Sequence, residues 1–361
     1  MDRRAMIAMS GGVDSSVAAH LMKERGFDCV GVTMKLFSNA DVGIDRDDVC
    51  CSLKDTEDAR DVAFRLGIPH YVFNFTAEFA ERVIRRFVEA YENGLTPNPC
   101  IDCNRYIKFD RLFARAMDLE YAFVVTGHYA RIEQTGRLPG SGRFLLKKAL
   151  DDAKDQSYFL YSMTQTQLAH TLFPLGGLRK QEVREIASAQ GFLNAKKHES
   201  QDVCFVTGGS YADFIEGHRG NRCPPGDFID PEGRVLGRHK GLIRYTVGQR
   251  KGLGLSFPRP MYVCGKNVLD NTVTLGDERL LYSKVLFAED VNWIVPPPSS
   301  IFKVRAKTRY RQPEQEATVR TEGGRIRVDF DEPQRAIATG QAVVLYDGDV
   351  VVGGGTIAAV E

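Results

Sequence analysis

The chain has 361 residues, which is enough for two or three domains. Its 48 basic side chains nearly balance its 47 acidic ones, so any surface for nucleic acid must be local rather than spread over the whole protein. No apolar stretch approaches the roughly 20 residues that span a bilayer. Eight cysteines in a long chain without an export signal favour cytosolic thiols over a disulfide scaffold, so we expect a cytoplasmic protein.

Residues 1–208 alternate between strand-like and helix-like segments. Short apolar runs predict strands at Ala5–Met9, Cys29–Met34, His70–Phe75 and Tyr121–Thr126. Amphipathic spacing predicts helices at Val13–Lys23, Asp55–Leu66 and Ala77–Glu92. This alternation predicts an α/β fold with a doubly wound parallel sheet, which binds ligands at the carboxyl ends of its strands. The first apolar run leads directly into a glycine loop, so we do not expect a signal peptide.

The segment Ser10-Gly11-Gly12-Val13-Asp14-Ser15 joins the first strand to the first helix. Gly11 and Gly12 leave room for an oxyanion at the start of a helix, where backbone amides and the helix dipole favour negative charge. Asp14 can hold Mg²⁺ on phosphates. No Lys-Ser/Thr pair follows the glycines, so this is not a Walker A loop. A tight turn with an Asp-Ser helix cap is the simpler alternative. The six residues Ser10–Ser15 instead resemble the pyrophosphate loop of enzymes that transfer AMP from ATP, and we favour this interpretation.

The character of the sequence changes after residue 206. Tyr211–Glu216 predicts a short helix, and Val263–Leu275 predicts a hairpin that turns at Asp270-Asn271. Four short alternating runs predict a small β-barrel near the end of the chain, at residues 302–308, 316–320, 325–330 and 342–346. We therefore expect a catalytic ATP-pyrophosphatase domain at 1–208, a small central linking domain at 209–278 and a C-terminal β-barrel at 279–361.

Cysteines lie on two polar segments that are far apart in the sequence. Thr96–Asn104 contains Cys100 and Cys103, and we expect it to be a loop that its prolines hold open between two helices. Cys204 comes directly after the polar segment 199–203. One thiolate of such a pair can carry a persulfide, and the other can resolve it by thiol–disulfide exchange.

Two simpler interpretations of the thiols stay open at this point. A CxxC pair is half of a zinc site, although no second CxxC or HxxxH supplies the other ligands at standard spacing. Free cysteines are also often buried packing residues, and we expect this of Cys29 and Cys264, which lie in strand-like runs. Cys50, Cys51 and Cys223 receive no role.

Basic residues gather at two places. Lys154–Tyr158 combines a cation, an amide and an aromatic ring just after the sheet domain. The segment Lys303–Arg311 has five cations at alternate positions, which on one strand would share a face with a spacing suited to phosphates. A solvated strand face is the alternative, although a ladder of one sign repels itself unless an anion is nearby.

Taken together, these motifs are similar to those of the tRNA-specific 2-thiouridylase family, and the resemblance runs from end to end. The motifs in chain order are SGGVDSS (10–16), VTMK (32–35), TPNPC-x-x-CN-x-x-IKF (96–109), TGHYA (126–130), KDQSYFL (154–160), SQDVCF (200–205), TVGQRKGLG (246–254), RYR (309–311) and GQ (340–341). Each later motif alone is modest support, whereas the ordered set is highly specific.

The resemblance implies ATP-dependent 2-thiolation of wobble uridine 34 in the tRNAs for Lys, Glu and Gln. ATP would adenylate the uridine C2 oxygen, and a persulfide would then supply sulfur at C2. Cys204 would carry the persulfide and Cys103 would be the partnering nucleophile. The implied partners are tRNA and a sulfur-carrier protein or desulfurase, and the implied cofactors are ATP and Mg²⁺.

Other site residues are also implied by matching position. The positions that match ATP contacts are Ala8, Met9, Ser10, Gly11, Gly12, Val13, Asp14, Ser15, Met34 and Gly127. Those that match residues around the target base are Asn98, Pro99 and Cys100. Those that match tRNA contacts are His128, Lys154, Asp155, Gln156, Arg309, Tyr310 and Gln341.

This chain departs from many family members at Cys100, where they carry Asp. An Asp could act as an acid or base there, and a Cys cannot do so in the same way. Cys100, Cys103 and Cys204 could instead hold an iron–sulfur cluster with one open iron site. The persulfide route is the interpretation we favour.

Two alternatives for the function remain open. Another adenylating enzyme with the same loop, such as an amidotransferase-type synthetase, would need no paired cysteines. A tRNA-binding protein without catalysis would need neither the intact loop nor both cysteines.

Overall fold

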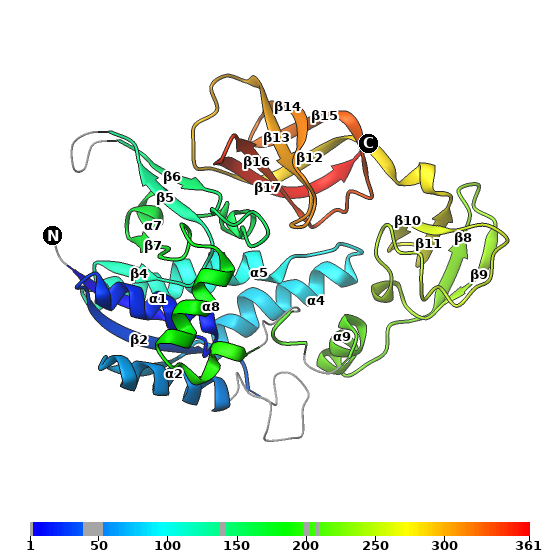
Figure 1. Ribbon diagram of the computed structural model, residues 1–361. Helices are drawn as coiled ribbons and strands as arrows, with labels where there is room; N and C mark the ends of the chain where they lie inside the picture. The colour runs from blue at the N-terminus through cyan, green and yellow to red at the C-terminus, as the bar shows by residue number, and fades with distance from the viewer. Residues whose placement is uncertain (1–2, 39–52, 137–141, 198–202, 207–208) are drawn as a thin grey trace. The chain divides into compact units, whose positions relative to one another are not determined.

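The computed structural model describes residues 3–38, 53–136, 142–197, 203–206 and 209–361 (Figure 1). The chain divides into two compact units. The first comprises Met1–Val83, Cys100–Thr207 and Gly348–Val352, and the second comprises Ile84–Pro99, Gly208–Asp347 and Gly353–Glu361. Cys50 and Cys51 lie outside the described residues. Within these ranges, no helix combines the length and the apolar character needed to cross a membrane.

The first unit is built on a five-stranded parallel sheet in the order β3-β2-β1-β4-β7. Its strands are β1 (Arg4–Ala8), β2 (Asp28–Lys35), β3 (His70–Asn74), β4 (Phe123–Val125) and β7 (Thr171–Leu172). The central strand β1 is almost entirely buried, as expected for a parallel strand that is covered on both faces. Because β2 and β4 flank β1 in parallel, the residues that come after these three strands emerge at one edge of the sheet.

Helices α1 (Val13–Glu24), α2 (Leu53–Leu66) and α8 (Lys180–Ala189) share one buried apolar cluster with the sheet. Val17 and Met22 of α1 are fully buried in this cluster together with Ile7 of β1. The parallel sheet with covering helices confirms the predicted α/β fold. Smaller elements complete the unit: β5 (Arg131–Gln134), β6 (Phe144–Lys147), η4 (Ser157–Leu160), α7 (Gln165–Ala169) and η5 (Leu193–Lys196).

The predicted helix at Ala77–Glu92 is an uninterrupted helical run of three elements. These are α3 (Thr76–Phe79), the π-helical η2 (Ala80–Ile84) and α4 (Arg85–Glu92). The boundary between the two compact units falls inside this run, at residue 84.

The segment with Cys100 and Cys103 differs from the predicted open loop. It folds into α5 (Pro99–Asp102), then the ten-residue π-helix η3 (Cys103–Leu112), then α6 (Phe113–Asp118). Pro99 stands at the first helical position, where a missing N–H costs nothing and a fixed φ favours the helix. Both cysteines therefore lie on the first turns of a helix, and π-helical turns inside helices are frequent at functional sites.

The second unit contains a four-stranded sheet in the order β10-β11-β8-β9. Its strands are β8 (Gly226–Ile229), β9 (Val235–His239), β10 (Tyr262–Asn267) and β11 (Thr272–Gly276). The hairpin β10–β11 has the predicted turn, in which Asn271 adopts a φ of 51°. Helix α9 (Tyr211–Arg219) packs against α4 through rings of Phe87, Tyr91 and Tyr211. Short 3₁₀ turns are η6 (Leu242–Arg244) and η7 (Glu278–Leu281).

The C-terminal part of the second unit is a six-stranded antiparallel barrel. Its strands follow the order β12-β15-β14-β13-β16-β17 and close through a β12–β17 pairing, and β6 and β5 continue the same sheet beyond β17. The strands are β12 (Tyr282–Trp293), β13 (Ile301–Lys307), β14 (Gln315–Glu322), β15 (Arg325–Arg335), β16 (Ala342–Asp347) and β17 (Val350–Val360). Closure removes the exposed strand edges of an open sheet, and it confirms the predicted barrel.

Candidate active site

The segment Ser10–Gly12 is the turn between β1 and α1, at the carboxyl edge of the sheet. Gly11 has a φ of +69°, and a Cβ on it would lie 2.2 Å from the carbonyl oxygen of Asp55. Gly12 is the N-cap of α1, and no side chain caps this helix. The hydroxyls of Ser15 and Ser16 each donate to the Gly12 carbonyl oxygen at 3.0 Å. The Asp-Ser cap of the simpler alternative is therefore absent, and the helix start presents backbone amides as an anion site requires.

Other residues that match ATP contacts lie around this turn. Ala8 ends the buried strand β1, Met9 follows it and is also buried, and Met34 is half-buried near the carboxyl end of β2. Gly127 comes shortly after β4, and a Cβ on it would lie 2.8 Å from the carbonyl carbon of Asp14 and 2.9 Å from the nitrogen of Ser15. The structure thus brings Gly127 directly against the start of α1.

Asp14 is held by Lys180, which lies in none of the sequence motifs, and by Tyr129 of the TGHYA motif. Lys180, buried at the start of α8, places its Nζ 2.7 Å and 2.8 Å from the two carboxylate oxygens, and the Tyr129 hydroxyl donates to Oδ1 at 2.7 Å. The Lys180 ammonium shows that a positive charge can be bound beside the Asp14 carboxylate. One carboxylate plus phosphate oxygens is a usual Mg²⁺ environment, so Asp14 fits the ion once Lys180 is displaced.

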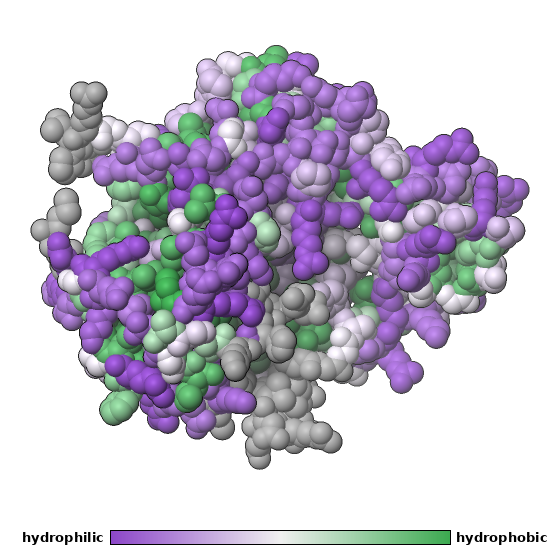
Figure 2. Space-filling model, viewed as in Figure 1, coloured by the Kyte–Doolittle hydropathy of each residue, from purple (hydrophilic) through white to green (hydrophobic). Residues whose placement is uncertain are grey.

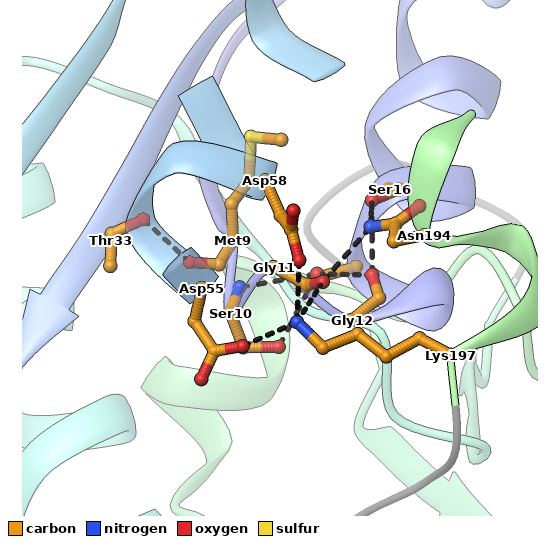
Figure 3. A network of polar contacts seen from close by, with 11 residues as sticks. Met9, Ser10, Gly11, Gly12, Ser16, Thr33, Asp55, Asp58, Asn194 and Lys197 are labelled. Carbon is orange, nitrogen blue, oxygen red and sulfur yellow. Dashed lines mark hydrogen bonds and ion pairs between the residues drawn. The ribbon is translucent and has the colours of Figure 1, made fainter. Parts of the chain in front are cut away.

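A second polar network holds the turn at Ser10–Gly12, which we call the phosphate loop, through the Gly11 carbonyl group (Figure 3). The carbonyl oxygen of Gly11 accepts from Asn194 Nδ2 at 3.0 Å and from Lys197 Nζ at 3.3 Å. The Lys197 ammonium also contacts the carboxylates of Asp55 and Asp58 on α2. Sequence reasoning missed these residues, because no local pattern indicates that they converge on residue 11.

The proposed sulfur-handling cysteines differ in exposure. Cys103 is half-buried at the start of η3, and Cys204 is exposed in a turn closed by a bond from Val206 N to Val203 O. Cys100 is exposed as a residue, but desolvation of its sulfur raises the pKa of the thiol, against an opposing effect of Lys108. A raised pKa keeps Cys100 protonated and makes it the poorer nucleophile.

Two other cysteines behave as packing residues. Cys29 is buried, and burial raises the pKa of its thiol to about 11, with a further contribution from Asp28. Cys264 is half-buried, and burial raises its pKa as well. Among the residues that the structure describes, no group of three or more His, Cys, Asp or Glu side chains is arranged to hold a metal ion. The three thiols at 100, 103 and 204 therefore do not form a ready-made cluster site.

The start of η3 is tied to the KDQSYFL segment. Asn104, beside Cys103, is buried and donates from Nδ2 to the carbonyl oxygen of Phe159 at 3.1 Å. Asp155 is buried and accepts from Ala149 N and from the Ser157 hydroxyl. Gln156 accepts from the backbone nitrogen of Tyr129 at 3.0 Å. Two of the three residues matched to tRNA contacts here thus organise the protein's own loops.

His128 is also buried, although its position matches a tRNA contact. Its Nδ1 lies 2.7 Å from the Thr126 hydroxyl, and its ring packs between Phe109 and Phe173. Burial, aided by the charge of Lys108, lowers the pKa of His128 well below its ordinary value. A neutral, enclosed imidazole weighs against direct contact with RNA.

The predicted cationic ladder is only partly correct. Strand β13 ends at Lys307, so Arg309, Tyr310 and Arg311 lie in the next turn and do not continue its face. On the strand, cations alternate with buried Val304 and Ala306 as expected. They form ion pairs with acids on other strands and in the following turn; the pairs are Lys303–Asp331, Arg305–Glu316 and Lys307–Glu314. The anions near these cations are therefore carboxylates of the protein, so the cationic strand face needs no RNA phosphates to offset its charge.

The turn after β13 keeps its cationic character. Arg311 is exposed, and half-buried Arg309 donates to the carbonyl oxygen of Ala336. Figure 2 shows a predominantly hydrophilic surface over the barrel strands in this view. Gln341, matched to a tRNA contact, directs its side-chain nitrogen to the carbonyl oxygens of Thr96 and Pro97.

Three family models match successive parts of the chain. A tRNA methyl transferase HUP domain matches residues 3–208, a tRNA methyl transferase PRC-barrel domain matches 212–277, and an aminomethyltransferase β-barrel domain matches 283–357.

Curated relatives match almost the whole chain. The tRNA-specific 2-thiouridylase MnmA of Clostridioides difficile is 49% identical over 99% of this chain and 98% of its own length. The chain belongs to the tRNA-specific 2-thiouridylase family. The protein of the same name in Moorella thermoacetica is 51% identical over 98% of this chain and 99% of its own length, and that in Symbiobacterium thermophilum is 49% identical over 98% and 92%.

Membership of the 2-thiouridylase family confirms the resemblance drawn from the motifs. The wording of the HUP-domain model refers to methyl transfer, whereas the full-length relatives are named as thiouridylases.

Proposed function

We propose that this protein is a tRNA-uridine 2-sulfurtransferase that uses ATP to thiolate wobble uridine 34 in the tRNAs for Lys, Glu and Gln. One observation carries the proposal. The turn at Ser10–Gly12 stands at the carboxyl edge of a parallel sheet, against Gly127, in a chain 49% identical to named 2-thiouridylases over nearly its full length.

The first half-reaction is adenylation. Backbone amides of the Ser10–Ser15 segment and the Lys180 ammonium would bind the ATP phosphates, and Asp14 would hold Mg²⁺, which supplies charge neutralisation when bound. Met34 and Gly127 would contact the nucleotide. The uridine C2 oxygen attacks the α-phosphorus, pyrophosphate leaves, and the C2 oxygen becomes part of an AMP leaving group.

The second half-reaction is sulfur transfer. The terminal sulfur of a Cys204 persulfide attacks C2, and AMP departs with the former C2 oxygen. The Cys103 thiolate then attacks the Cys204 sulfur, which releases 2-thiouridine and leaves a Cys103–Cys204 disulfide. A cellular thiol reductant must reduce this disulfide, and a sulfur-carrier protein or desulfurase must load the next persulfide.

We assign tRNA recognition to two sets of residues. Asn98, Pro99 and Cys100 would surround the target base. Lys154, Arg309 and Tyr310 are half-buried and would contact tRNA. His128, Asp155 and Gln156 would act indirectly, by holding the protein's own loops in place. We place the activity in the cytoplasm, where tRNA and reduced thiols are present.

The test separates the two half-reactions. Asp14→Ala should abolish tRNA-dependent pyrophosphate release and leave tRNA affinity within about twofold, because it removes a group near the phosphates and none that faces RNA. Cys204→Ser should release pyrophosphate and form no 2-thiouridine. Normal pyrophosphate release by Asp14→Ala would contradict the proposal that the Ser10–Ser15 segment binds the ATP phosphates.

The same experiment addresses the two alternatives. Full activity in a Cys103/Cys204 double variant would indicate another adenylating synthetase. Tight tRNA binding by the wild-type protein without any conversion of ATP to AMP would indicate a tRNA-binding protein without catalysis.

A further inference from the structure

The turn Thr339–Gln341 in the barrel grips an extended segment before Cys100. The backbone nitrogen of Thr96 donates to the Thr339 carbonyl oxygen at 2.8 Å. The Gln341 side chain donates from Nε2 to the carbonyl oxygens of Thr96 at 2.8 Å and Pro97 at 3.2 Å. Three hydrogen bonds therefore hold two successive residues of this segment, and all of these residues belong to the second unit.

The gripping turn is itself fixed to the barrel wall. Gly340 N donates to the Ile357 carbonyl oxygen at 2.8 Å, and Ile357 N donates back to the Gln341 carbonyl oxygen at 2.8 Å. Ile357 is a buried residue of β17. Two backbone hydrogen bonds therefore tie the turn to a buried position of β17.

The two segments approach so closely that position 340 requires glycine. Gly340 has a φ of +87°, and a Cβ on it would lie 2.9 Å from Leu95 Cβ and 3.0 Å from Thr96 N. The first contact is shorter than real Cβ atoms show and the second is tight, so the segment at 95–97 has little room to shift toward the barrel. The clamp formed by Thr339–Gln341 therefore fixes both the position and the direction of the chain as it leaves Pro97.

The proposed target-base segment comes directly after Pro97 in the chain. It begins with Asn98 and Pro99, Cys100 lies on the first turn of α5, and Cys103 begins η3. The compact units also change between residues 99 and 100, so the clamp lies just before the point where the chain passes into the ATP-binding unit.

We infer that Gln341 is a positioning residue, which sets the placement of the target-base segment by holding the carbonyl groups of Thr96 and Pro97. This inference rests on the proposed function. It assigns Gln341 a role different from the tRNA contact implied by family resemblance, because its side-chain donor group is directed at the protein's own backbone.

The test compares Gln341→Glu and Gln341→Ala with wild type. Glutamate has nearly the same shape, but its carboxylate cannot donate and repels both carbonyl oxygens. At saturating tRNA, ATP and persulfide donor, the single-turnover thiolation rate should fall at least about tenfold, on the order of two lost hydrogen bonds. The dissociation constant for tRNA should stay within about threefold. Gln190→Glu makes the same chemical change at an exposed helix end and should match wild type.

A second variant and a second readout keep the inference independent of one substitution. Gly340→Ala should reproduce the rate loss, because its methyl group would push on Leu95 and Thr96. Hydrogen exchange at the Thr96 amide should accelerate in Gln341→Ala, and this measurement needs no enzymatic activity.

The outcomes separate the inference from the function on which it rests. A weaker tRNA affinity with an unchanged saturated rate would overturn the inference and make Gln341 an RNA contact. An unchanged rate despite faster Thr96 exchange would also overturn it, since the clamp would then not matter for catalysis. Absence of thiolation by the wild-type protein would instead refute the proposed function, and the exchange experiment would still report on the clamp.

Discussion

At the residue scale, the three candidate sulfur-handling thiols have separate environments that predict separate phenotypes. Cys204→Ser should block thiolation in a single turnover, because a hydroxyl cannot carry a sulfane sulfur. Cys103→Ser should block repeated turnovers, since nothing resolves the bond to Cys204. Cys100→Ser should keep substantial activity, because its raised pKa disfavours a thiolate and it needs only to line the base pocket.

The measurement is mass spectrometry of 2-thiouridine after single and multiple turnovers. A loss in Cys100→Ser as large as that in Cys204→Ser would contradict the persulfide route. In that case a three-thiolate cluster becomes the better explanation, and anaerobically reconstituted protein should absorb broadly near about 400 nm.

The buried histidine His128 predicts a pH dependence of stability. Its folded-state pKa lies below the ordinary value of 6.5, so the folded protein resists protonation that the unfolded chain accepts. The stabilising contribution is therefore complete above about pH 6.5 and is lost as pH falls. For a histidine that stays neutral in the fold, the loss between pH 7.5 and pH 5.5 is on the order of 1 kcal/mol. Urea denaturation of wild type and His128→Gln should show a smaller pH dependence in the variant, and equal dependence would contradict the assignment.

At the element scale, the phosphate loop depends on close packing between the turn before α1 and the start of α2. Gly11→Ala should disrupt the loop, because φ is +69° and the new methyl would overlap the Asp55 backbone. Gly12→Ala is the matched control, since its φ is −89° and its nearest obstacle is the Ser10 hydroxyl at 3.4 Å. Equilibrium ATP binding should fall at least about tenfold in Gly11→Ala and much less in Gly12→Ala. Equal binding by the two variants would show that the turn tolerates a side chain at both positions.

The turn after β13 is the element that we expect to bind phosphates of tRNA. The Arg309→Ala/Arg311→Ala variant should bind tRNA more weakly, with a log–log salt slope reduced by about one unit or less per lost contact. Arg305→Ala removes a cation already paired with Glu316 and should change the slope less. A filter-binding salt series that gives the double variant a wild-type slope would leave this turn as an ordinary solvated surface.

Sequence periodicity was sufficient to predict the helices and strands that are determined by their own residues. The strands around residues 5–9 and 29–34, the hairpin at 263–275 and the barrel strands could be predicted from alternation and turn residues. The helix at Pro99–Asp118 could not, because the prolines and polar residues of Thr96–Asn104 are typical of a loop and no local rule predicts a π-helix. The cationic ladder was predicted correctly only as far as Lys307, and its acidic partners could not be predicted because they lie on other strands.

The candidate site divides in the same way. The glycine loop, Gly127 and the cysteines carry motifs that can be found by inspection. Lys180, Asn194 and Lys197 are each more than 160 residues away in sequence from the residues at 11–14 that they contact. These contacts therefore form only when the chain folds. Local patterns contain no signal for such pairings.

At the scale of the whole molecule, the two compact units divide the proposed tasks. The first unit contains the phosphate loop, Cys103 and Cys204, and the second contains the barrel and the segment at 84–99. The predicted boundaries 1–208, 209–278 and 279–361 stay a prediction. Residues 84–99 group with the barrel, so the proposed tRNA-contacting turn after β13 and the segment before Cys100 belong to the same compact unit.

The most direct test of the central claim is mass spectrometry of nucleosides from unmodified tRNA for Lys, Glu or Gln. The tRNA is incubated with the full-length protein, ATP, Mg²⁺ and a persulfide donor. We expect 2-thiouridine at position 34, with one AMP and one pyrophosphate released for each sulfur incorporated, and no 2-thiouridine when ATP is omitted. Conversion of ATP to AMP without 2-thiouridine, or 2-thiouridine formed without ATP, would contradict the proposed function.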